Sequence, residues 1–312
     1  MSFTSEIKQE IANIKLADHC ARAQLSALIQ LTSSLTISKN GLGILVRSES
    51  PTTSKRVVYL TKQLYKVDTE LQVAKKTNLK KNNVYTITIS ERTTEIMENL
   101  GLYTARGLQS HPSYDVVTRN CCACAYLAGA FLAYGSCNSP YNKNYHLEIS
   151  LSELEHANFI VKLISRAGIS AKIAKRRTRY IVYMKKADYI SDFLALIGAH
   201  TAMMAFEDER IERDFVNSNS RINNCELANE VKTIKASSKQ VEDIEKIIRF
   251  GKYDKLNEKI KNVADLRLKY QDYSLLELCE AYQSMYGDAI SKSGMKHRLN
   301  KIEAIADELE EE

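Results

Sequence analysis

One apolar stretch organises the sequence: Asn120-Cys-Cys-Ala-Cys-Ala-Tyr-Leu-Ala-Gly-Ala-Phe-Leu-Ala-Tyr-Gly-Ser136. It predicts a buried helix that carries small side chains on one side, at Ala125, Gly129 and Ala133. Small residues at every fourth position share one face of a helix and let a second helix backbone approach closely. We therefore expect this helix to pack against a partner helix from the same chain.

A matching stretch lies earlier in the chain, Ala23-Gln-Leu-Ser-Ala-Leu-Ile-Gln-Leu-Thr-Ser-Ser34. It has the same apolar character and the same abrupt exit into a turn and strand. When Leu25 is placed on Leu127, Ala27 falls on Gly129. This correspondence predicts an internal duplication.

The predicted order of elements repeats with these two helices. After an opening amphipathic helix, each half reads as a helix, two strands, a helix, two strands and a helix. Asn40-Gly41 signals the first hairpin, and Ser152-x-x-Glu155 predicts a capping box at the start of a helix in the second half. We predict an α+β fold in which residues 1–200 form a duplicated αββαββα domain, with halves at about 18–110 and 111–200.

The composition changes after residue 200. Residues 201–237 combine a charged helical segment with an Asn-rich stretch, which we interpret as a linker. Residues 238–312 are predicted to form an all-α helix-turn-helix domain, with separate helices at 239–249, 255–270, 274–285 and 291–309. Ser274 and Glu277 have the spacing of a capping box at the start of the third of these helices.

The last predicted helix has the pattern of a recognition helix. Met295, Leu299, Ile302 and Ile305 form an apolar stripe, and donors cover the rest of its N-terminal half. Such a helix presents donors to the DNA major groove. An ordinary amphipathic helix with a solvated basic face is the alternative. The candidate DNA-binding residues of this domain are Ser274, Ser291, Lys292, Ser293, Lys296, His297, Arg298 and Lys301.

The second hairpin of each half is basic. Between Lys172 and Lys186 there are seven basic residues and no acidic one. If a pseudo-twofold axis relates the halves, the two hairpins line one surface suited to a phosphate backbone. Hairpin tips that are simply solvated and Lys-rich are the alternative. The candidate phosphate contacts are Lys75, Lys76, Lys172, Lys175, Arg176, Arg177 and Arg179.

Length, charge and cysteines narrow the class of protein. The chain has 312 residues and a net charge of +6, which suits an anionic partner. No apolar run approaches the roughly 18 residues of a membrane span, and the N-terminus lacks a secretory pattern, so we expect a cytoplasmic protein without membrane contact. The seven cysteines suggest reduced thiols. We identify neither paired Cys-x-x-Cys motifs nor a Cys/His quartet, and expect no metal and no cofactor.

The paired apolar helices resemble the signature helices of the LAGLIDADG homing endonucleases, whose fold is the duplicated αββαββα saddle. Read against that family's nine-letter motif, the segments here are 25–33 and 127–135. In active members the eighth position of each motif is the metal-binding carboxylate, and here it is Thr32 and Tyr134. Neither side chain supplies the anionic oxygen that Mg²⁺ prefers. The resemblance therefore implies a saddle without nuclease activity and without catalytic residues.

The chain as a whole is similar to the WhiA family of bacterial regulators. Three features carry this resemblance: a saddle domain without the metal-binding carboxylates, a connector at Arg221-Ile-Asn-Asn-Cys-Glu-Leu-Ala-Asn, and a C-terminal Ser291-Lys-Ser-Gly-x-x-His-Arg-Leu-x-Lys-Ile. One departure is the Cys-rich start of the second motif helix, where we expect more polar residues. The resemblance implies a nucleoid-associated transcription factor that acts on sporulation or on cell division and chromosome segregation.

In that family the helix-turn-helix is the main reader of promoter DNA, and the saddle is auxiliary. The implied partner is double-stranded promoter DNA, with another regulator or RNA polymerase as further candidates, and we expect a monomer. A scaffold protein whose saddle binds a protein partner, with incidental DNA contact, is the alternative.

Overall fold

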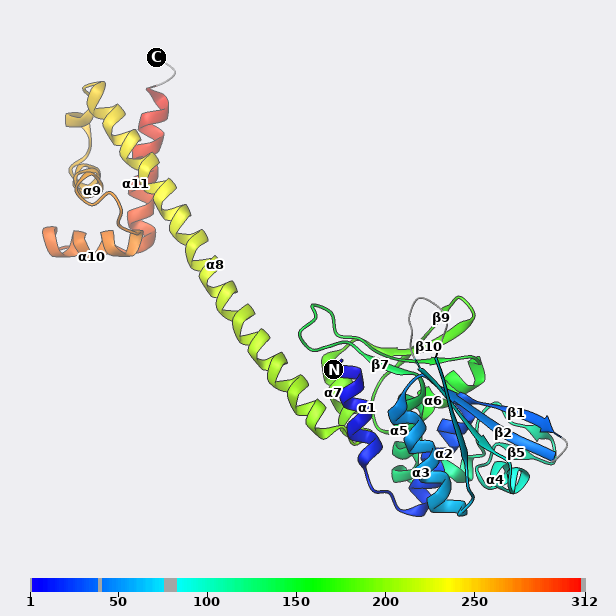
Figure 1. The fold of residues 1–312 in the computed structure, drawn as a ribbon. Helices are drawn as coiled ribbons and strands as arrows, with labels where there is room; N and C mark the ends of the chain where they lie inside the picture. Colours follow the sequence, from blue (N-terminus) through cyan, green and yellow to red (C-terminus); the bar gives the residue numbers. More distant parts are fainter. Residues whose placement is uncertain (1, 39–40, 76–82, 310–312) are drawn as a thin grey trace. The chain divides into compact units, whose positions relative to one another are not determined.

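The computed structural model describes residues 2–38, 41–75 and 83–309. The chain divides into two compact units, Met1–Arg213 and Asp214–Glu312. Each unit has its own apolar core. The helices and strands of both units are drawn in Figure 1, and we describe each unit by itself. The predicted turn residue Asn40 lies outside the described residues.

The first unit opens with α1 (Phe3–Asn13) and then repeats one order of elements twice. Its first half contains α2 (Asp18–Thr32), β1 (Ser33–Ser38), β2 (Gly41–Ser48), α3 (Pro51–Tyr65), β3 (Glu70–Lys75), β4 (Asn83–Ile89) and α4 (Thr93–Asn99). Its second half contains α5 (Asn120–Tyr134), β7 (Gly135–Cys137), β8 (Leu147–Leu151), α6 (Leu154–Arg166), β9 (Lys172–Arg176), β10 (Arg179–Met184) and α7 (Ala187–Leu196). A small hairpin, β5 (Tyr103–Thr104) and β6 (Gly107–Leu108), and a 3₁₀ turn (Tyr114–Val117) connect them. The predicted duplicated αββαββα order is confirmed.

Each half folds its strands into an antiparallel sheet. The strand orders are β1-β2-β4-β3 and β7-β8-β10-β9. In the first sheet Val46 pairs with Ile87 and Ile44 with Ile89, and all four are fully buried. Because successive side chains of a strand point to opposite faces, their neighbours form an open face on the other side of the sheet.

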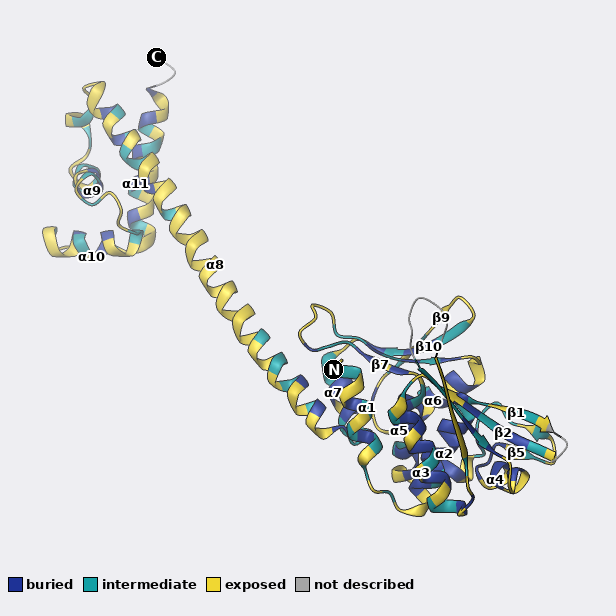
Figure 2. Ribbon diagram, viewed as in Figure 1, coloured by how far each residue is buried: buried dark blue, intermediate teal, exposed yellow. Residues whose placement is uncertain are grey.

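The two motif helices α2 and α5 pack closely, and Figure 2 shows both as largely buried. A Cβ added at Gly129 of α5 would lie 2.5 Å from the backbone oxygen of Gln24 and 2.9 Å from Cβ of Ala27 in α2. The helices therefore cross where the sequence pairs Ala27 with Gly129. The predicted partner helix in the same chain is confirmed.

The predicted capping box at Ser152 is wrong. The helix α6 begins at Leu154, with Glu153 as the residue before it and no side-chain cap. The preceding strand β8 stays paired with β10 as far as Leu151, opposite Tyr180, so the chain is still leaving the sheet at Ser152.

The second unit is helical. It contains the part of α8 (His200–Arg249) that follows Arg213, a 3₁₀ turn (Tyr253–Lys255), α9 (Glu258–Lys269), α10 (Leu275–Tyr286) and α11 (Lys292–Glu308). The helix predicted at 239–249 is not separate, because residues 200–249 form the one continuous helix α8. No glycine or proline occurs between residues 201 and 249, so nothing strongly interrupts the helix there despite the asparagines. The predicted capping box of Ser274 and Glu277 starts α10 as expected.

Candidate nucleic-acid interface

The helix α11 presents the predicted recognition residues at its N-terminal half. Ser291 caps the helix, and its hydroxyl accepts a hydrogen bond from the Gly294 backbone N–H at 3.1 Å. Met295, Leu299 and Ile302 are buried in the core of the second unit. The exposed residues are Ser291, Lys292, Ser293, Lys296, His297 and Lys301. This arrangement has the chemistry of a groove-reading helix, with the apolar side inward and the donors outward.

Arg298 lies differently from its neighbours. It is half-buried, and its Nη1 donates to the Tyr282 hydroxyl at 2.9 Å and to the Lys259 carbonyl at 3.4 Å. Its guanidinium also lies 5.3 Å from the centre of the Tyr282 ring. These contacts join α11 to α9 and α10, so Arg298 holds the recognition helix in place within the unit.

Sequence reasoning missed Asn300. This side chain is exposed and lies four residues after Lys296 and three after His297, on the same side of α11. An amide is the side chain that pairs most specifically with adenine in the major groove. The helical spacing from Lys296 was the available signal, but a single asparagine did not stand out from the basic residues around it.

The turn between α9 and α10 is held by internal polar contacts. The Ser274 hydroxyl accepts from the Glu277 N–H at 3.4 Å, and the Ser274 N–H donates to the Glu277 carboxylate at 2.7 Å. These bonds to Ser274 hold the pKa of Glu277 below its usual value. Arg267 is 2% exposed and donates to the carbonyls of Tyr270, Gln271 and Tyr273. The Ser274 hydroxyl is thus engaged as a helix cap.

The second sheet divides its basic residues between two faces. Lys172 pairs with Tyr183 and Arg176 with Arg179, on the open face. Lys175 lies on the opposite face of the strand, where it pairs with Tyr180. Its Nζ is 5.9 Å from the centre of the Tyr180 ring. Arg177 occupies the hairpin turn with a positive φ of 56°. The predicted basic hairpin therefore offers one basic row on the open face rather than a uniform surface.

Arg179 is tied to its own sheet. Its Nε donates to the Ser150 hydroxyl at 2.7 Å and its Nη2 to the Ser150 carbonyl at 3.0 Å. The guanidinium lies 4.8 Å from the centre of the Tyr134 ring. Arg179 thus contributes positive charge to the open face while its donors are partly occupied.

The first sheet presents a different open face. Arg47, Thr86 and Gln72 lie side by side across β2, β4 and β3, on the face opposite Val46 and Ile87. Lys75 belongs to the other face by the same alternation, and Lys76 lies outside the described residues. Sequence reasoning missed Arg47, because the lysines at the hairpin tip were the stronger charge signal.

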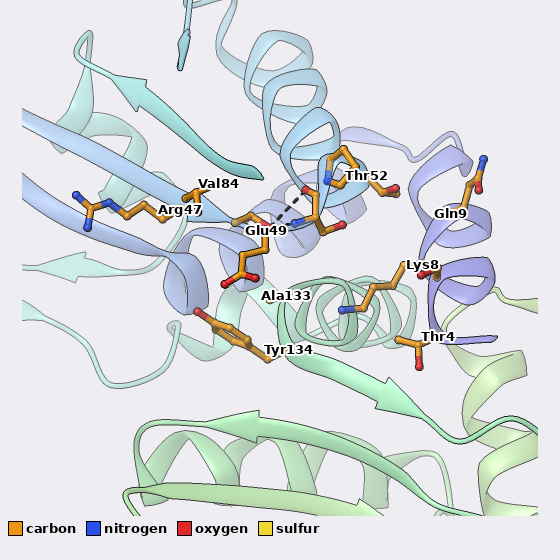
Figure 3. Close-up of a pocket in the computed structure, with 13 residues that line it drawn as sticks. Thr4, Lys8, Gln9, Arg47, Glu49, Thr52, Val84, Ala133 and Tyr134 are labelled. Carbon is orange, nitrogen blue, oxygen red and sulfur yellow. Dashed lines mark hydrogen bonds between the residues drawn. The ribbon is translucent and has the colours of Figure 1, made fainter. Parts of the chain in front are cut away.

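The C-terminal ends of the motif helices hold Thr32 and Tyr134. Thr32 is buried, and its hydroxyl donates to the Leu28 carbonyl at 2.6 Å. Tyr134 is 39% exposed and lines a hollow of about 720 Å³ together with Lys8, Arg47 and Glu49 (Figure 3). Burial lowers the pKa of Lys8 to about 8. Among the described residues that line this hollow, Glu49 is the one carboxylate, whereas two-metal hydrolysis needs several anionic ligands.

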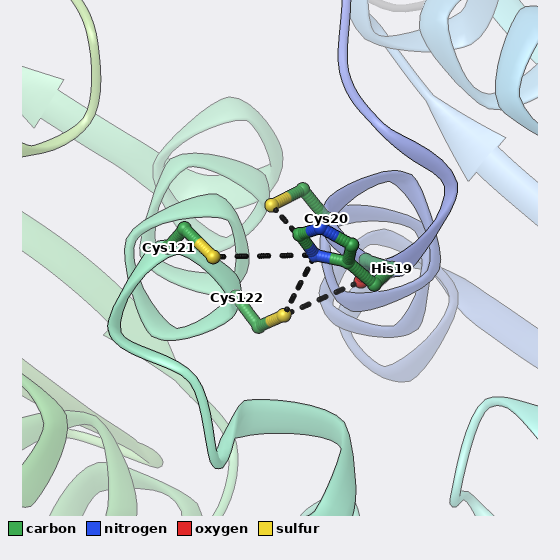
Figure 4. Close-up of side chains that lie close together, drawn as sticks. All are labelled: His19, Cys20, Cys121 and Cys122. Carbon is green, nitrogen blue, oxygen red and sulfur yellow. Dashed lines mark hydrogen bonds between the residues drawn. The ribbon is translucent and has the colours of Figure 1, made fainter.

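The opposite ends of the same helices gather His19, Cys20, Cys121 and Cys122 (Figure 4). One ligand atom from each residue can be chosen so that all four lie within 4.8 Å of one another. The expectation that the chain holds no Cys/His quartet is therefore wrong. The quartet forms only in space, because residues from the two halves meet where α2 and α5 begin.

Two αββαββα halves with crossed motif helices, followed by a helix-turn-helix unit, define a LAGLIDADG-like protein with an appended helix-turn-helix domain. Three domain families match this chain: the WhiA N-terminal LAGLIDADG-like domain over residues 18–103, the WhiA LAGLIDADG-like domain over 123–216 and the WhiA C-terminal HTH domain over 219–306. The chain belongs to the WhiA family, as its sequence resemblance predicts.

Relatives cover the whole chain. A protein of Oceanobacillus iheyensis is 42% identical over 313 residues, which span 99% of this chain and 98% of its own. A protein of Bacillus pumilus is 42% identical over 310 residues, covering 99% and 97%. Both are named probable cell division protein WhiA.

Solved structures share the fold. The crystal structure of full-length WhiA from Thermatoga maritima covers 99% of both chains, with a TM-score of 0.59 and 24% identity. The crystal structure of the N-terminal LAGLIDADG domain of WhiA has a TM-score of 0.51 and 25% identity, and covers 63% of this chain and 90% of that one. Within the described part of this chain, no helix combines the length and apolar character needed to span a membrane.

Proposed function

We propose that this chain is a sequence-specific transcription regulator that binds double-stranded promoter DNA. The processes it controls are cell division and chromosome segregation, or sporulation, and it acts in the cytoplasm at the nucleoid. The observation that carries the proposal is the outward face of α11, where Ser293, Lys296, His297 and Asn300 are exposed above a buried apolar stripe. The names of the relatives support the link to cell division.

The two units divide the work on DNA. Lys296 donates to guanine O6 and N7, and Asn300 pairs with adenine, so α11 supplies base recognition. Arg298 acts by positioning α11, because its donors contact Tyr282 and Lys259. Lys172 and Arg176 on the open face of the second sheet contact phosphates and add affinity that does not depend on sequence.

The same chain is proposed not to be a nuclease. Thr32 and Tyr134 replace the carboxylates that hold metal ions in active LAGLIDADG enzymes, and Glu49 is the one carboxylate among the described residues that line the adjoining hollow. Supercoiled plasmid incubated with the purified protein and Mg²⁺ should stay intact. Nicking that disappears when Glu49 is changed to Gln would overturn this part of the proposal.

The test is selection of bound duplexes from a random pool by the full chain at two salt concentrations. We expect one short motif to be enriched, and Lys296→Ala with Asn300→Ala to weaken binding to it by about 10- to 100-fold. The control Lys255→Ala removes one charge beside the C-terminal end of α11, near Glu308, and should leave specific binding within about twofold. If the full chain enriches no motif, the proposal fails.

A second candidate function is a scaffold whose saddle binds a protein. It is supported by a second hollow of about 780 Å³, whose lining combines the apolar side chains of Val58, Tyr59 and Leu71 with polar ones such as Lys55 and Lys62. Tyr59 and Leu71 are each 51% exposed. Another regulator or RNA polymerase is the candidate partner. Leu71→Glu should abolish capture of that partner and preserve DNA binding; a variant that still captures it would remove the support.

A further inference from the structure

Four metal-binding side chains meet at the N-terminal ends of α2 and α5. Nδ1 of His19 lies 3.2 Å from Sγ of Cys20, 3.3 Å from Sγ of Cys122 and 4.0 Å from Sγ of Cys121. The three sulfurs surround one ring nitrogen, as Figure 4 shows. None of these four side chains lines the hollow at the other end of these helices.

The quartet is built from two pairs that the duplication relates. His19 and Cys20 are the second and third residues of α2, and Cys121 and Cys122 are the second and third residues of α5. The offset in sequence is the one that places Ala27 on Gly129 at the helix crossing. The site therefore spans the two halves of the saddle, with each half supplying two ligands from the first turn of its motif helix.

The distances suit a tetrahedral zinc site. Zinc bonds of about 2.3 Å to sulfur and 2.0–2.1 Å to nitrogen place ligand atoms about 3.6 Å apart for N and S and about 3.8 Å apart for two S atoms. The observed N···S distances of 3.2 to 4.0 Å bracket that value, and all ligand atoms lie within 4.8 Å. A bound zinc ion would shorten the 4.0 Å distance from His19 Nδ1 to Sγ of Cys121 and lengthen the 3.2 Å distance to Sγ of Cys20.

The surroundings also suit a bound cation. Cys20 and Cys122 are 8% and 4% exposed, whereas His19 and Cys121 reach solvent. A cation thus has an entry path on one side and a protected position on the other. Burial raises the pKa of the Cys20 and Cys122 thiols, so a zinc ion would displace their protons as it binds.

We infer that His19, Cys20, Cys121 and Cys122 form a structural Zn²⁺ site that clamps the two halves of the saddle together. Four protein ligands leave no open position, so the metal stabilises the fold and takes no part in a reaction. The site lies at the end of α2 and α5 opposite to Thr32 and Tyr134, about 20 Å away for helices of 15 residues. Its loss should therefore weaken the saddle without removing a DNA contact.

The first experiment measures metal in the full chain purified under reducing conditions without chelator. We expect inductively coupled plasma mass spectrometry to find about one zinc ion per chain. Cys121→Ser with Cys122→Ser should abolish zinc binding, whereas the controls Cys124→Ser and Cys225→Ser, which change thiols outside the quartet, should retain it. A wild-type chain that holds no zinc and takes none up at micromolar free Zn²⁺ overturns the inference.

The second experiment does not depend on whether the double variant folds. Co²⁺ added to the wild-type chain should give the absorption of a tetrahedral cobalt thiolate, with an intensity that reports three sulfur ligands. His19→Cys should keep zinc with four sulfurs, and His19→Ala should weaken zinc binding at least tenfold. A Cys20–Cys122 disulfide found in the cytosolic protein by non-reducing peptide mapping would overturn the inference as well.

Metal removal also separates this inference from the proposed function. A chelator strong enough to remove zinc should lower the melting temperature of the saddle and leave recognition of the selected DNA motif by α11 in place. If the chain binds zinc but enriches no DNA motif, the regulator proposal fails and the zinc site stands. If the chain enriches a DNA motif but binds no zinc, the zinc inference fails and the regulator proposal stands.

Discussion

The two halves of the saddle domain share their packing and differ in the side chains they present. Both motif helices meet at equivalent positions, Ala27 and Gly129, where only small side chains fit. At their C-terminal ends Thr32 is buried and bonded within its own helix, whereas Tyr134 is exposed under the Arg179 guanidinium. Both halves thus carry a small residue where the two backbones cross, and they differ at the C-terminal ends of the helices.

The open faces of the two sheets diverge in the same way. Arg47 lies in a row with the neutral Thr86 and Gln72 in the first half. The second half presents Lys172, Arg176 and Arg179. Among the described residues, the open face of the second sheet thus carries more basic side chains than that of the first, and we expect any phosphate contact by the described open faces to depend more on the second half.

The largest expected effect comes from breaking the feature that the halves share. Gly129→Val places a branched side chain where even a Cβ would lie 2.5 Å from a backbone oxygen of α2. We expect the saddle to lose about 4 kcal/mol of stability, or to fail to fold. Calorimetry of the full chain should show a lowered saddle transition, with the second unit unchanged. Cys124→Val, half-buried on the same helix, is the control, and equal melting of both variants would contradict the close crossing.

Acid should expose a difference between the halves. Residues 18–110 contain one histidine, the exposed His19, whereas His156 in the second half is buried with its Nε2 2.8 Å from the Tyr126 hydroxyl. Burial, with a smaller contribution from His111, lowers the pKa of His156 to about 4. The unfolded chain takes up this proton near pH 6.5, so stability is full above that pH and falls as the pH drops towards 4.

The size of this acid effect is about 3 kcal/mol, reached near pH 4 and constant below it. Denaturant unfolding from pH 7 to 4 measures it. His156→Gln should flatten this part of the pH dependence, and His297→Gln, exposed on α11, should leave it as in the wild type. A pH dependence that is unchanged in His156→Gln would show that another group carries it.

Removing charge from the two open faces tests their asymmetry. Lys172→Ala with Arg176→Ala should lower affinity for any duplex about tenfold and reduce the slope of log K against log salt by about 2. Arg47→Ala should reduce that slope by about 1 or less. Lys175→Ala, on the other face of the same hairpin, is the matched control and should change binding least. Filter binding at several salt concentrations measures all three, and equal effects would rule out a one-sided phosphate contact.

The smallest effects are expected at the diverged helix ends. Thr32→Val removes a hydroxyl that donates to a carbonyl within its own helix, and Tyr134→Leu removes one cation–π contact with Arg179. Each should cost about 1 kcal/mol or less in denaturant unfolding. If either variant lost several kcal/mol of unfolding free energy, the helix ends would contribute to packing as strongly as the crossing of α2 and α5.

Periodicity predicted the order of the helices and strands in the first unit, and the resemblance to the LAGLIDADG family supplied the saddle fold. The small residues Ala125, Gly129 and Ala133 predicted a close helix partner, and the repeated element order predicted the duplication. The continuous α8 was not predicted, because asparagine and serine favour loops statistically but do not stop a helix that lacks glycine and proline.

The candidate sites were less predictable, because they depend on which face a side chain occupies. Arg298 and Lys296 look equivalent in the sequence, yet one contacts Tyr282 and the other faces solvent. The Cys/His quartet joins two adjacent pairs from distant parts of the chain, and neither pair alone has the spacing of a metal motif. Only the crossing of α2 and α5 brings the pairs together.

Because α2 packs against α5, the saddle core cannot form during synthesis until α5 has been made. The apolar face of α2 is complete once Thr32 has been made, but its partner is complete only at Tyr134. At about 5–20 residues per second, a ribosome needs about 5–20 s to make the intervening chain. During that interval the first half exposes an apolar helix face without its partner, so the nascent chain offers a binding site to chaperones before the saddle closes.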